Sequence, residues 1–185
     1  EFALKVADQT RRKYLYLLTV ADMRATGPEV YNSWKGALLR QLYYSTLQAM
    51  RRGLDNPLLD SENIKEHQTQ ARQLLAAKNV HQNAIDQLWL RFNDDYFLFH
   101  SGTEIAWHTE SILNSRADQL PLILMQNSEQ RGGTEIFIYH HDHDRLFAQV
   151  TGTLEQLGLT VADARILTTT DNFCLDTYIA LDEYS

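Results

Sequence analysis

Cysteine, proline and glycine are scarce in this sequence, which has one, three and eight of them among 185 residues. A single cysteine, Cys174, excludes an intrachain disulfide framework and fits a reducing cytoplasm, so we expect a cytoplasmic protein with Cys174 packed in a core. So little proline and glycine argues against long disordered segments. The apolar stretch at 14–21 falls far short of the roughly 20 residues that a membrane helix requires. We therefore expect no membrane partner.

Charge is divided unevenly along the chain, whose net charge is −7. Residues 1–52 carry nine Lys and Arg against four Asp and Glu, whereas residues 53–185 carry eight against twenty. The N-terminal cations are dispersed among aromatic residues and leucines, which is typical of solvated helical faces. We therefore expect no nucleic-acid partner. The length allows one large core or two small ones.

Helical periodicity predominates before residue 120. The pattern predicts five helices, at 1–26, 29–52, 61–79, 81–92 and 103–117. The first is apolar on most sides and is expected to be buried, whereas the third is polar with a thin apolar seam and is expected to be exposed. The last begins with a capping box, in which the Ser101 oxygen accepts an orphan amide and Glu104 reaches back to the serine amide.

The pattern changes from helical to alternating near Leu120. After a strand-like run at 122–125, the segments 134–139, 144–157, 159–169 and 173–181 predict the order strand, helix, strand, strand. Alternation in the last strand predicts a sheet covered on one face, and Asp171-Asn172 predicts a hairpin turn. The predicted fold class is α+β, with a helical bundle segment followed by a small sheet domain.

The region 120–183 resembles the ACT domain, a ferredoxin-like βαββαβ fold that senses ligands, with its last helix and strand expected beyond Ser185. The strand-to-helix corner of that family typically reads Asp-x-Pro-Gly-Leu, where the glycine lets a ligand approach amides at the helix N-terminus. Here the corner at 142–146 reads Asp-His-Asp-Arg-Leu. The resemblance implies ligand contacts at Asp142, Arg145 and Leu146, with the Arg145 cation able to attract a carboxylate.

Histidine and aspartate gather at 140–144, where two imidazoles and a carboxylate could in principle hold a borderline metal ion. Consecutive residues of an extended strand point to opposite faces, so these side chains do not converge without a tight turn. We favour a polar loop in which Asp142 or Asp144 caps the next helix. The two His-Asp dipeptides also resemble the HD phosphohydrolase signature, which requires a helix rather than a loop. The remaining histidines lack metal-site spacing and are expected to be structural.

Asp22 follows the apolar run of the first predicted helix, near its C-terminal end, where the helix dipole disfavours a carboxylate. A buried unpaired carboxylate is costly, so Asp22 pairs with Arg24 or another cation, faces water, or binds a metal. The sequence Leu-Thr-Val-Ala-Asp resembles the last helix of HD-type metal phosphohydrolases, where an aspartate completes a divalent-metal site. The resemblance implies that Asp22 is a metal ligand whose partner ligands lie upstream.

Several segments in a fixed order carry a wider resemblance. An HD-type helix, the stretches "YNSWKGALLRQLYY" and "DDYFLFHSGTEIAWH", and an ACT-like region with "GGTEIFIY" are together similar to the family of bifunctional PII uridylyltransferase/uridylyl-removing enzymes. The resemblance implies a parent with a nucleotidyltransferase domain that moves UMP from UTP to a PII tyrosine. It also implies an HD domain that hydrolyses the product with Mg or Mn, and two ACT domains that sense glutamine.

The same resemblance divides the chain into three parts. Residues 1–28 correspond to the last helix of the HD domain, residues 29–119 to a helical linker, and residues 120–185 to most of the first ACT domain. Both ends of the chain are expected to continue in the parent. By itself the chain is expected to be inactive and to require no cofactor, because its catalytic ligands are incomplete.

Two other functions remain open. One is an amino-acid-binding or dimerisation module without chemistry, in which an unfinished sheet exposes an edge and favours a homodimer. The other is an independent HD hydrolase, which lacks its ligands in this sequence. Glutamine binding and pairing of chains distinguish the module from a purely structural segment.

Overall fold

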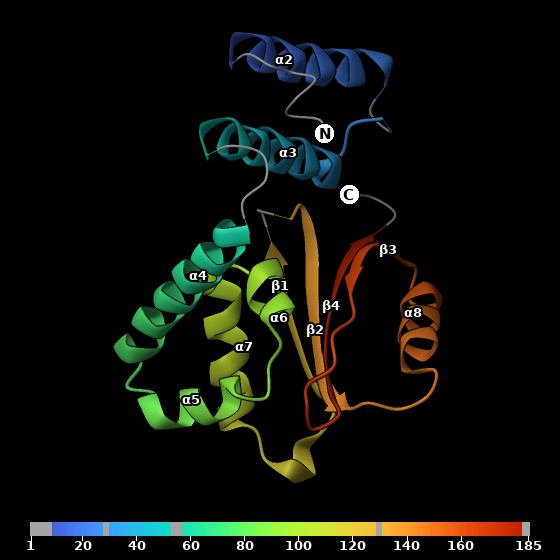
Figure 1. The fold of residues 1–185 in the computed structure, drawn as a ribbon. Coiled ribbons are helices and arrows are strands. Elements are labelled where there is room, and N and C mark those ends of the chain that lie inside the picture. The colour runs from blue at the N-terminus through green and yellow to red at the C-terminus, as the bar shows by residue number, and fades with distance from the viewer. Residues whose placement is uncertain (1–8, 28–29, 53–56, 129–130, 183–185) are drawn as a thin grey trace.

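Helices precede a four-stranded sheet in the structure, a computed structural model that describes residues 9–27, 30–52, 57–128 and 131–182 (Figure 1). The helices are α2 (Gln9–Thr26), α3 (Ser33–Arg52), α4 (Pro57–Ala77), α5 (Gln82–Trp89), α6 (Asp94–Phe99), α7 (Gly102–Asn114), the 3-10 turn η1 (Ala117–Gln119) and α8 (Leu146–Gln156). The strands are β1 (Leu122–Ser128), β2 (Gly133–His141), β3 (Leu159–Arg165) and β4 (Phe173–Asp182). This arrangement confirms the α+β class. In the described part of the chain, every helix is too short or too polar to cross a membrane.

The predicted capping box at the start of α7 is confirmed. Ser101 Oγ accepts a hydrogen bond from the Glu104 amide at 3.3 Å, and Glu104 Oε2 accepts one from the Ser101 amide at 2.6 Å. These bonds satisfy two backbone donors that a helix start leaves without intrahelical partners. They also hold the Glu104 side chain in a buried position, where it meets residues of the sheet.

The helix predicted at 81–92 is shorter in the structure, and a second helix that was not predicted follows it. Helix α5 ends at Trp89, and the chain takes an extended conformation at Asn93 before α6 begins. Asp94 and Asp95 lie in the first turn of α6, where the helix dipole favours negative charge. This acidic start supports a separate short helix that apolar periodicity alone did not predict.

The sheet is antiparallel, with strand order β1-β2-β4-β3. The elements β2, α8, β3 and β4 confirm the predicted order strand, helix, strand, strand. Strand β1 pairs with β2, with Leu122 opposite Tyr139 and Ser128 opposite Gly133. It therefore fills the side of β2 that the βαββ order leaves open. Within the described residues, the sheet has its edges at β1 and β3.

The turn predicted at Asp171-Asn172 is confirmed. Asn172 adopts φ of 64°, in the left-handed region that asparagine tolerates, and its amide donates to the Thr169 carbonyl at 3.1 Å. The Asp171 carboxylate accepts a hydrogen bond from Arg91 at 2.7 Å. This ion pair connects the β3–β4 loop to the residues that follow α5.

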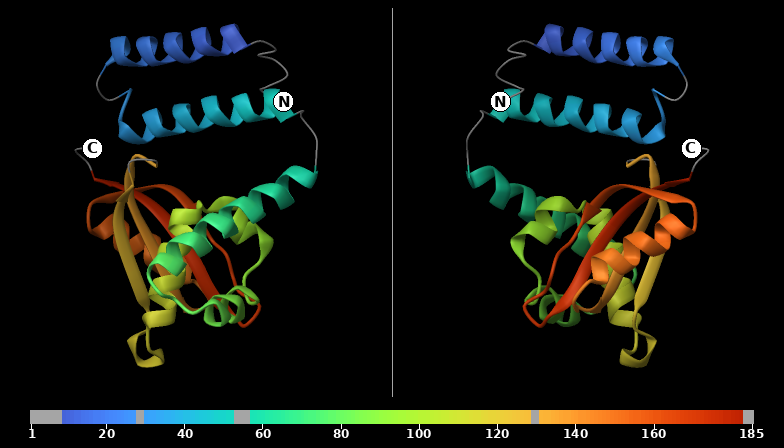
Figure 2. Two further views of the ribbon diagram at one scale, coloured as in Figure 1. Left: turned by 90° about the vertical axis from the view of Figure 1, so that its left-hand side faces the viewer. Right: turned by 90° about the vertical axis from the view of Figure 1, so that its right-hand side faces the viewer.

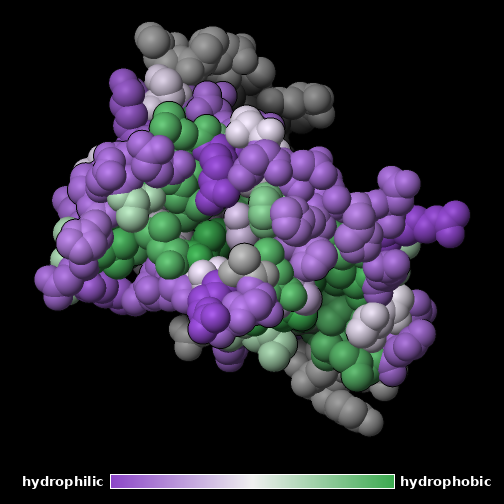
Figure 3. Space-filling model, turned by 90° about the horizontal axis from the view of Figure 1, so that it is seen from below, coloured by the Kyte–Doolittle hydropathy of each residue, from purple (hydrophilic) through white to green (hydrophobic). Residues whose placement is uncertain are grey.

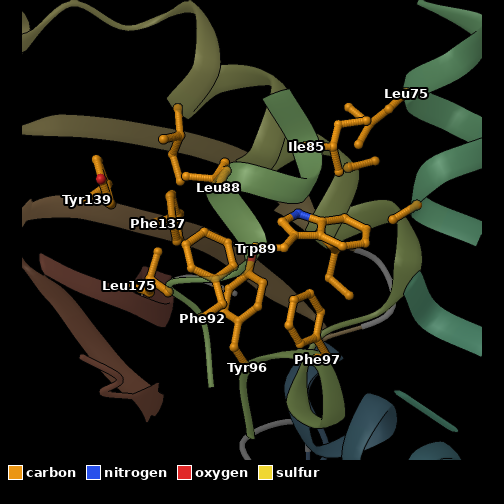
Figure 4. Close-up of a cluster of buried hydrophobic side chains, with 14 residues drawn as sticks. Leu75, Ile85, Leu88, Trp89, Phe92, Tyr96, Phe97, Phe137, Tyr139 and Leu175 are labelled. Carbon is orange, nitrogen blue, oxygen red and sulfur yellow. The ribbon is translucent and has the colours of Figure 1, made fainter. Parts of the chain in front are cut away.

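Helices cover both faces of the sheet, so the prediction of one covered face is wrong. Helices α4, α6 and α7 lie on one side and α8 on the other (Figure 1). The first side holds a large core whose aromatic members cluster beneath the sheet (Figure 4). The core against α8 is smaller and consists of Ile136, Ile138, Leu154, Cys174, Tyr178 and Ala180. The central strand β4 is buried on both faces, because its side chains alternate between the core under α4 to α7 and the core under α8.

Two further expectations concern individual side chains. Cys174 is 1% exposed, which confirms its predicted place in the core. Helix α4 was expected to be exposed, yet Ala71 and Leu75 on its apolar seam are fully buried against the first core. This narrow apolar seam is enough to attach α4 to the core, because α7 packs closely along α4 (Figure 1).

Helix α2 is largely exposed, and the prediction that it is buried is wrong for this chain. It lies on the outer side of α3, away from the sheet (Figure 2). Tyr14, Leu17 and Leu18 are 62%, 60% and 66% exposed. Apolar side chains also reach the surface elsewhere, as the view from below shows (Figure 3). Scattered apolar residues are ordinary on a protein surface. Neighbouring exposed apolar residues on one helix are typical of a surface that packs against another protein segment.

Candidate functional site

The strand-to-helix corner predicted from the sequence lies between β2 and α8. The Asp142 amide donates to the Asn172 carbonyl at 2.9 Å, and the Thr168 hydroxyl donates to Asp142 Oδ2 at 3.1 Å. Asp142 therefore fastens the corner to the β3–β4 loop. The expectation that Asp142 or Asp144 caps the helix is wrong, because Arg145 takes the N-cap position without a side-chain cap.

Arg145 occupies a backbone conformation that glycine adopts more easily. Its φ of 67° and ψ of 12° lie in the left-handed region, where the Cβ atom of other residues meets steric conflict. This is the position at which the ACT pattern has glycine. The Arg145 side chain is exposed, and the neighbouring Leu146 is half-buried against the core beneath α8. Asp142, Arg145 and Leu146 thus lie at one corner, and their role in ligand binding stays a prediction.

Replacing Arg145 with glycine is expected to raise the free energy of unfolding by about 0.5–1 kcal/mol. A left-handed residue other than glycine costs about 1–3 kcal/mol, of which the greater flexibility of glycine in the unfolded chain offsets part. Urea unfolding of Arg145→Gly and of Arg145→Ala measures the effect. Alanine keeps the conflict and removes the charge, so equal gains in both variants would show that backbone strain is not the cause.

The histidine-rich loop next to this corner uses its rings locally. His140 Nδ1 lies 2.8 Å from the His141 carbonyl oxygen, and His143 Nδ1 lies 3.1 Å from the Asp144 carbonyl oxygen. Because a carbonyl only accepts, each Nδ1 carries a proton in these contacts. Across the described ranges, no three or more His, Cys, Asp or Glu side chains gather as a metal site requires.

Asp22 lies on α2, two turns beyond the exposed Tyr14, and its side chain is exposed. Arg24, the partner considered for it, places its guanidinium 4.8 Å from the centre of the Tyr31 ring. Of the three arrangements that the sequence leaves open, the structure places Asp22 toward solvent. Its role as a metal ligand stays a prediction.

A buried ion pair that the sequence did not predict joins α7 to the start of β2. Arg131 Nε donates to Glu104 Oε1 at 2.6 Å, and the two side chains are 14% and 9% exposed. Burial alone raises the pKa of Glu104, but the hydrogen bond and charge of Arg131 outweigh it and hold that pKa well below its usual range. Glu104 is therefore ionised in the folded chain.

A second carboxyl group lies beside this pair. Glu135, on β2, is fully buried, and its Oε2 accepts a hydrogen bond from Gln126 at 2.9 Å. Its Oε1 has no hydrogen-bond partner in the described residues. Burial, followed by the negative charge of Glu104, raises the pKa of Glu135 to about 7. A protonated Glu135 can donate to Glu104, which accounts for the otherwise unsatisfied oxygen.

Two buried histidines complete the polar part of this core. His100 Nδ1 lies 2.8 Å from the Tyr96 carbonyl oxygen, so it carries the proton, and Nε2 accepts from the Thr177 hydroxyl at 3.0 Å. His108 stacks on Phe137 with ring centres 3.7 Å apart. Burial lowers the pKa of His100 to about 4 and that of His108 well below its usual value. Both rings are neutral at pH 7, as expected for structural histidines.

Comparison with known proteins shows which sequences this chain is similar to. The family model described as the fifth domain of uridylyltransferase GlnD matches residues 60–111, from α4 into α7. Over 98% of its length the chain is 48% identical to the bifunctional uridylyltransferase/uridylyl-removing enzymes of Pseudomonas putida and Pseudomonas aeruginosa. It spans about a fifth of these curated relatives, 21% of each. No solved structure matches the chain. The chain therefore belongs to the family of bifunctional uridylyltransferase/uridylyl-removing enzymes, as one segment of such a protein.

Proposed function

We propose that this chain is a regulatory and structural segment of an enzyme that uridylylates and deuridylylates the PII nitrogen-signalling protein in response to glutamine. The observation that carries the proposal is 48% identity across 98% of the chain to relatives whose names state both activities. The segment contributes helices and a sheet rather than a complete catalytic site. It is therefore expected to have neither activity when isolated.

The exposed surface of α2 supports a place at the end of an HD-type domain, within residues 1–28. Tyr14, Leu18 and Asp22 are spaced by four residues and so lie along one face of the helix. The two apolar members are 62% and 66% exposed, and Asp22 is exposed beside them. Packing against preceding parts of an HD domain would cover the apolar pair and bring Asp22 to that domain's metal site.

Asp22 fits the proposed divalent cation, Mg or Mn, as a single ligand. Carboxylate oxygens are preferred by these hard cations, and the exposed side chain leaves its oxygens accessible. The remaining ligands belong to the parts of the enzyme that precede this segment. When bound, the metal would supply an activated water for hydrolysis of the uridylyl bond. Asp22 would hold one coordination position for it.

Replacing Asp22 with asparagine in the full-length enzyme is expected to lower uridylyl removal by about 100-fold or more. Even residues that only orient metal ligands typically contribute 10–100-fold to activity. Uridylyl transfer is expected to change little, because it belongs to a different domain. Release of UMP from uridylylated PII and transfer of UMP from UTP measure the two activities separately.

Asp118→Asn is the matched control, because Asp118 is another exposed aspartate whose side chain is 66% exposed beside Arg116. It is expected to leave both activities intact. Equal uridylyl removal by Asp22→Asn and Asp118→Asn would overturn the metal-ligand role of Asp22.

Residues 120–185 are proposed to form most of the first ACT domain, with glutamine contacting Asp142, Arg145 and Leu146. The left-handed backbone at Arg145 supports this correspondence, since the ACT pattern has glycine at that position. The exposed guanidinium offers a cation to the carboxylate of an amino acid. Residues 29–119 are the proposed linker, although α4 to α7 share a core with the sheet.

Edge-to-edge pairing of the sheet is a second candidate function. Strand β1 is an edge strand, and its Ile123 and Met125 side chains are 54% and 69% exposed. An exposed apolar edge strand is a template for pairing with another chain. A homodimer through this edge would give a mass twice 21.4 kDa in light scattering. A monomer at all accessible concentrations would exclude it.

A further inference from the structure

A polar basin with a volume of about 550 Å³ lies between α3, α4, α6 and the arginines that flank the sheet. It is open to solvent and separate from the strand-to-helix corner. The corner follows the last residue of β2, whereas Arg131 precedes the first. Nine residues of strand separate the two regions, about 30 Å at 3.3 Å per residue. The two sites therefore lie at opposite ends of β2.

Three guanidinium groups line the basin, from Arg40, Arg131 and Arg165. Its carboxylates come from Glu66, which is exposed, and from Glu104. The Glu104 oxygens already accept hydrogen bonds from Ser101 and Arg131, so they add little further acceptor capacity. The basin thus has an excess of positive charge in a chain whose overall charge is negative.

Two of the guanidinium groups meet at one backbone oxygen. Arg131 Nη2 donates to the Phe99 carbonyl at 3.3 Å, and Arg165 Nη1 donates to the same oxygen. This carbonyl ends α6, so the helix dipole favours cations there. The carbonyl supplies only a partial negative charge, and the full negative charge of Glu104 is already paired with Arg131. A guanidinium has five N–H donors, more than the observed bonds of either arginine require.

Burial strengthens the repulsion between Arg131 and Arg165, because little solvent screens their charges. The Arg131 and Arg165 side chains are 14% and 18% exposed. Burial, followed by the nearby charge of Arg131, lowers the pKa of Arg165. Asp163 lies 3.8 Å from Arg165 Nε, but its side chain is 45% exposed, so solvent screens that contact. An anion in the basin would relieve the repulsion between the two arginines.

We propose that this basin binds a small oxyanion, a carboxylate or a phosphate, through Arg131, Arg165 and Arg40. Arg131 and Arg165 form the inner end beside Phe99, and Arg40 extends from the exposed side of α3. Planar guanidinium groups bind the two oxygens of a carboxylate or phosphate in parallel. Binding would connect α3 and α6 to the sheet through one ligand. The site needs no residue of the corner or of α2.

Titration of the 185-residue chain with inorganic phosphate and with succinate tests the site. Amide chemical shifts are followed at constant ionic strength with chloride. Saturable shifts are expected at 99–104, 131 and 165. The anion with the lower dissociation constant shows whether the site prefers a phosphate or a carboxylate. Arg165→Gln is expected to weaken binding by about tenfold, the size of one charge-assisted hydrogen bond. Arg40→Gln, on an exposed side chain, is expected to weaken it several-fold and tests the site if Arg165→Gln does not fold.

Arg116→Gln is the matched control, because Arg116 is an exposed arginine outside the basin lining. It is expected to bind as the wild type does. Absence of saturable shifts with both ligands, or equal affinities in Arg40→Gln and Arg116→Gln, would overturn the proposal. Neither result depends on uridylyl transfer or removal, so the basin and the proposed enzyme function are tested separately.

Discussion

Replacing Arg131 with glutamine is expected to lower the free energy of unfolding by about 3 kcal/mol. Arg131 and Glu104 form a hydrogen-bonded ion pair at 2.6 Å in which both side chains are largely buried. Removing one partner leaves the other charge buried and unpaired, which typically costs about 3–5 kcal/mol. Urea unfolding of Arg131→Gln at pH 7 measures the loss.

Glu104→Gln and the double variant complete a thermodynamic cycle for this pair. Glutamine keeps the capping box with Ser101 but removes the charge, so the cycle isolates the ion pair. The surface pair Lys78–Glu110, with side chains 56% and 27% exposed, is the control and is expected to contribute less than about 1 kcal/mol. If Arg131→Gln lost no more stability than Glu110→Gln, the buried ion pair would be no more stabilising than the surface pair.

Glu135→Gln is expected to become progressively more stable than the wild type as pH rises from about 5 to 8. Glu135 has a pKa of about 7 in the fold, against about 4.3 in an unfolded chain. Between these values the folded wild type binds more protons than the unfolded chain, so its stability falls as pH rises. Glutamine does not titrate, and the difference between the proteins is expected to change by about 3 kcal/mol over this range.

In both the wild type and Glu135→Gln, His100 and His108 make stability fall as pH falls, which is opposite to the effect of Glu135. Because burial lowers the pKa of each ring, the unfolded chain binds more protons as pH falls below about 6.5, and acid destabilises the fold. This contribution cancels when Glu135→Gln is compared with the wild type at each pH. Unfolding curves at several pH values measure the difference, and a difference independent of pH would mean that Glu135 is ionised throughout.

The order of elements was predictable because periodicity records which side chains face a core. The run 134–139, the helix near 146–156 and the two final strands follow from local alternation and spacing. The capping box at Ser101 and Glu104 was equally local. Helix α6 was missed, since it is only six residues long and only Asn93 with the two aspartates marks its start.

Contacts between distant segments were not predictable from one sequence. Burial of both sheet faces depends on α4 to α7 folding back on the sheet, and exposure of α2 depends on which segments surround it. In a strand, a polar residue such as Glu135 is normally predicted to face solvent. Arg131 precedes that strand and belongs to no sequence motif that would predict its partner. Their association with Glu104 across 27 residues or more arises only in the folded chain.

The central claim, that this segment senses glutamine within the parent enzyme, is tested most directly by hydrogen exchange on the full-length protein with and without glutamine. Ligand contacts at the corner are expected to slow exchange of backbone amides between 142 and 150, at the start of α8. A smaller change is expected along β2, which joins the corner to the helical core. Unchanged exchange throughout residues 9–182 at saturating glutamine would contradict a sensory role for this segment.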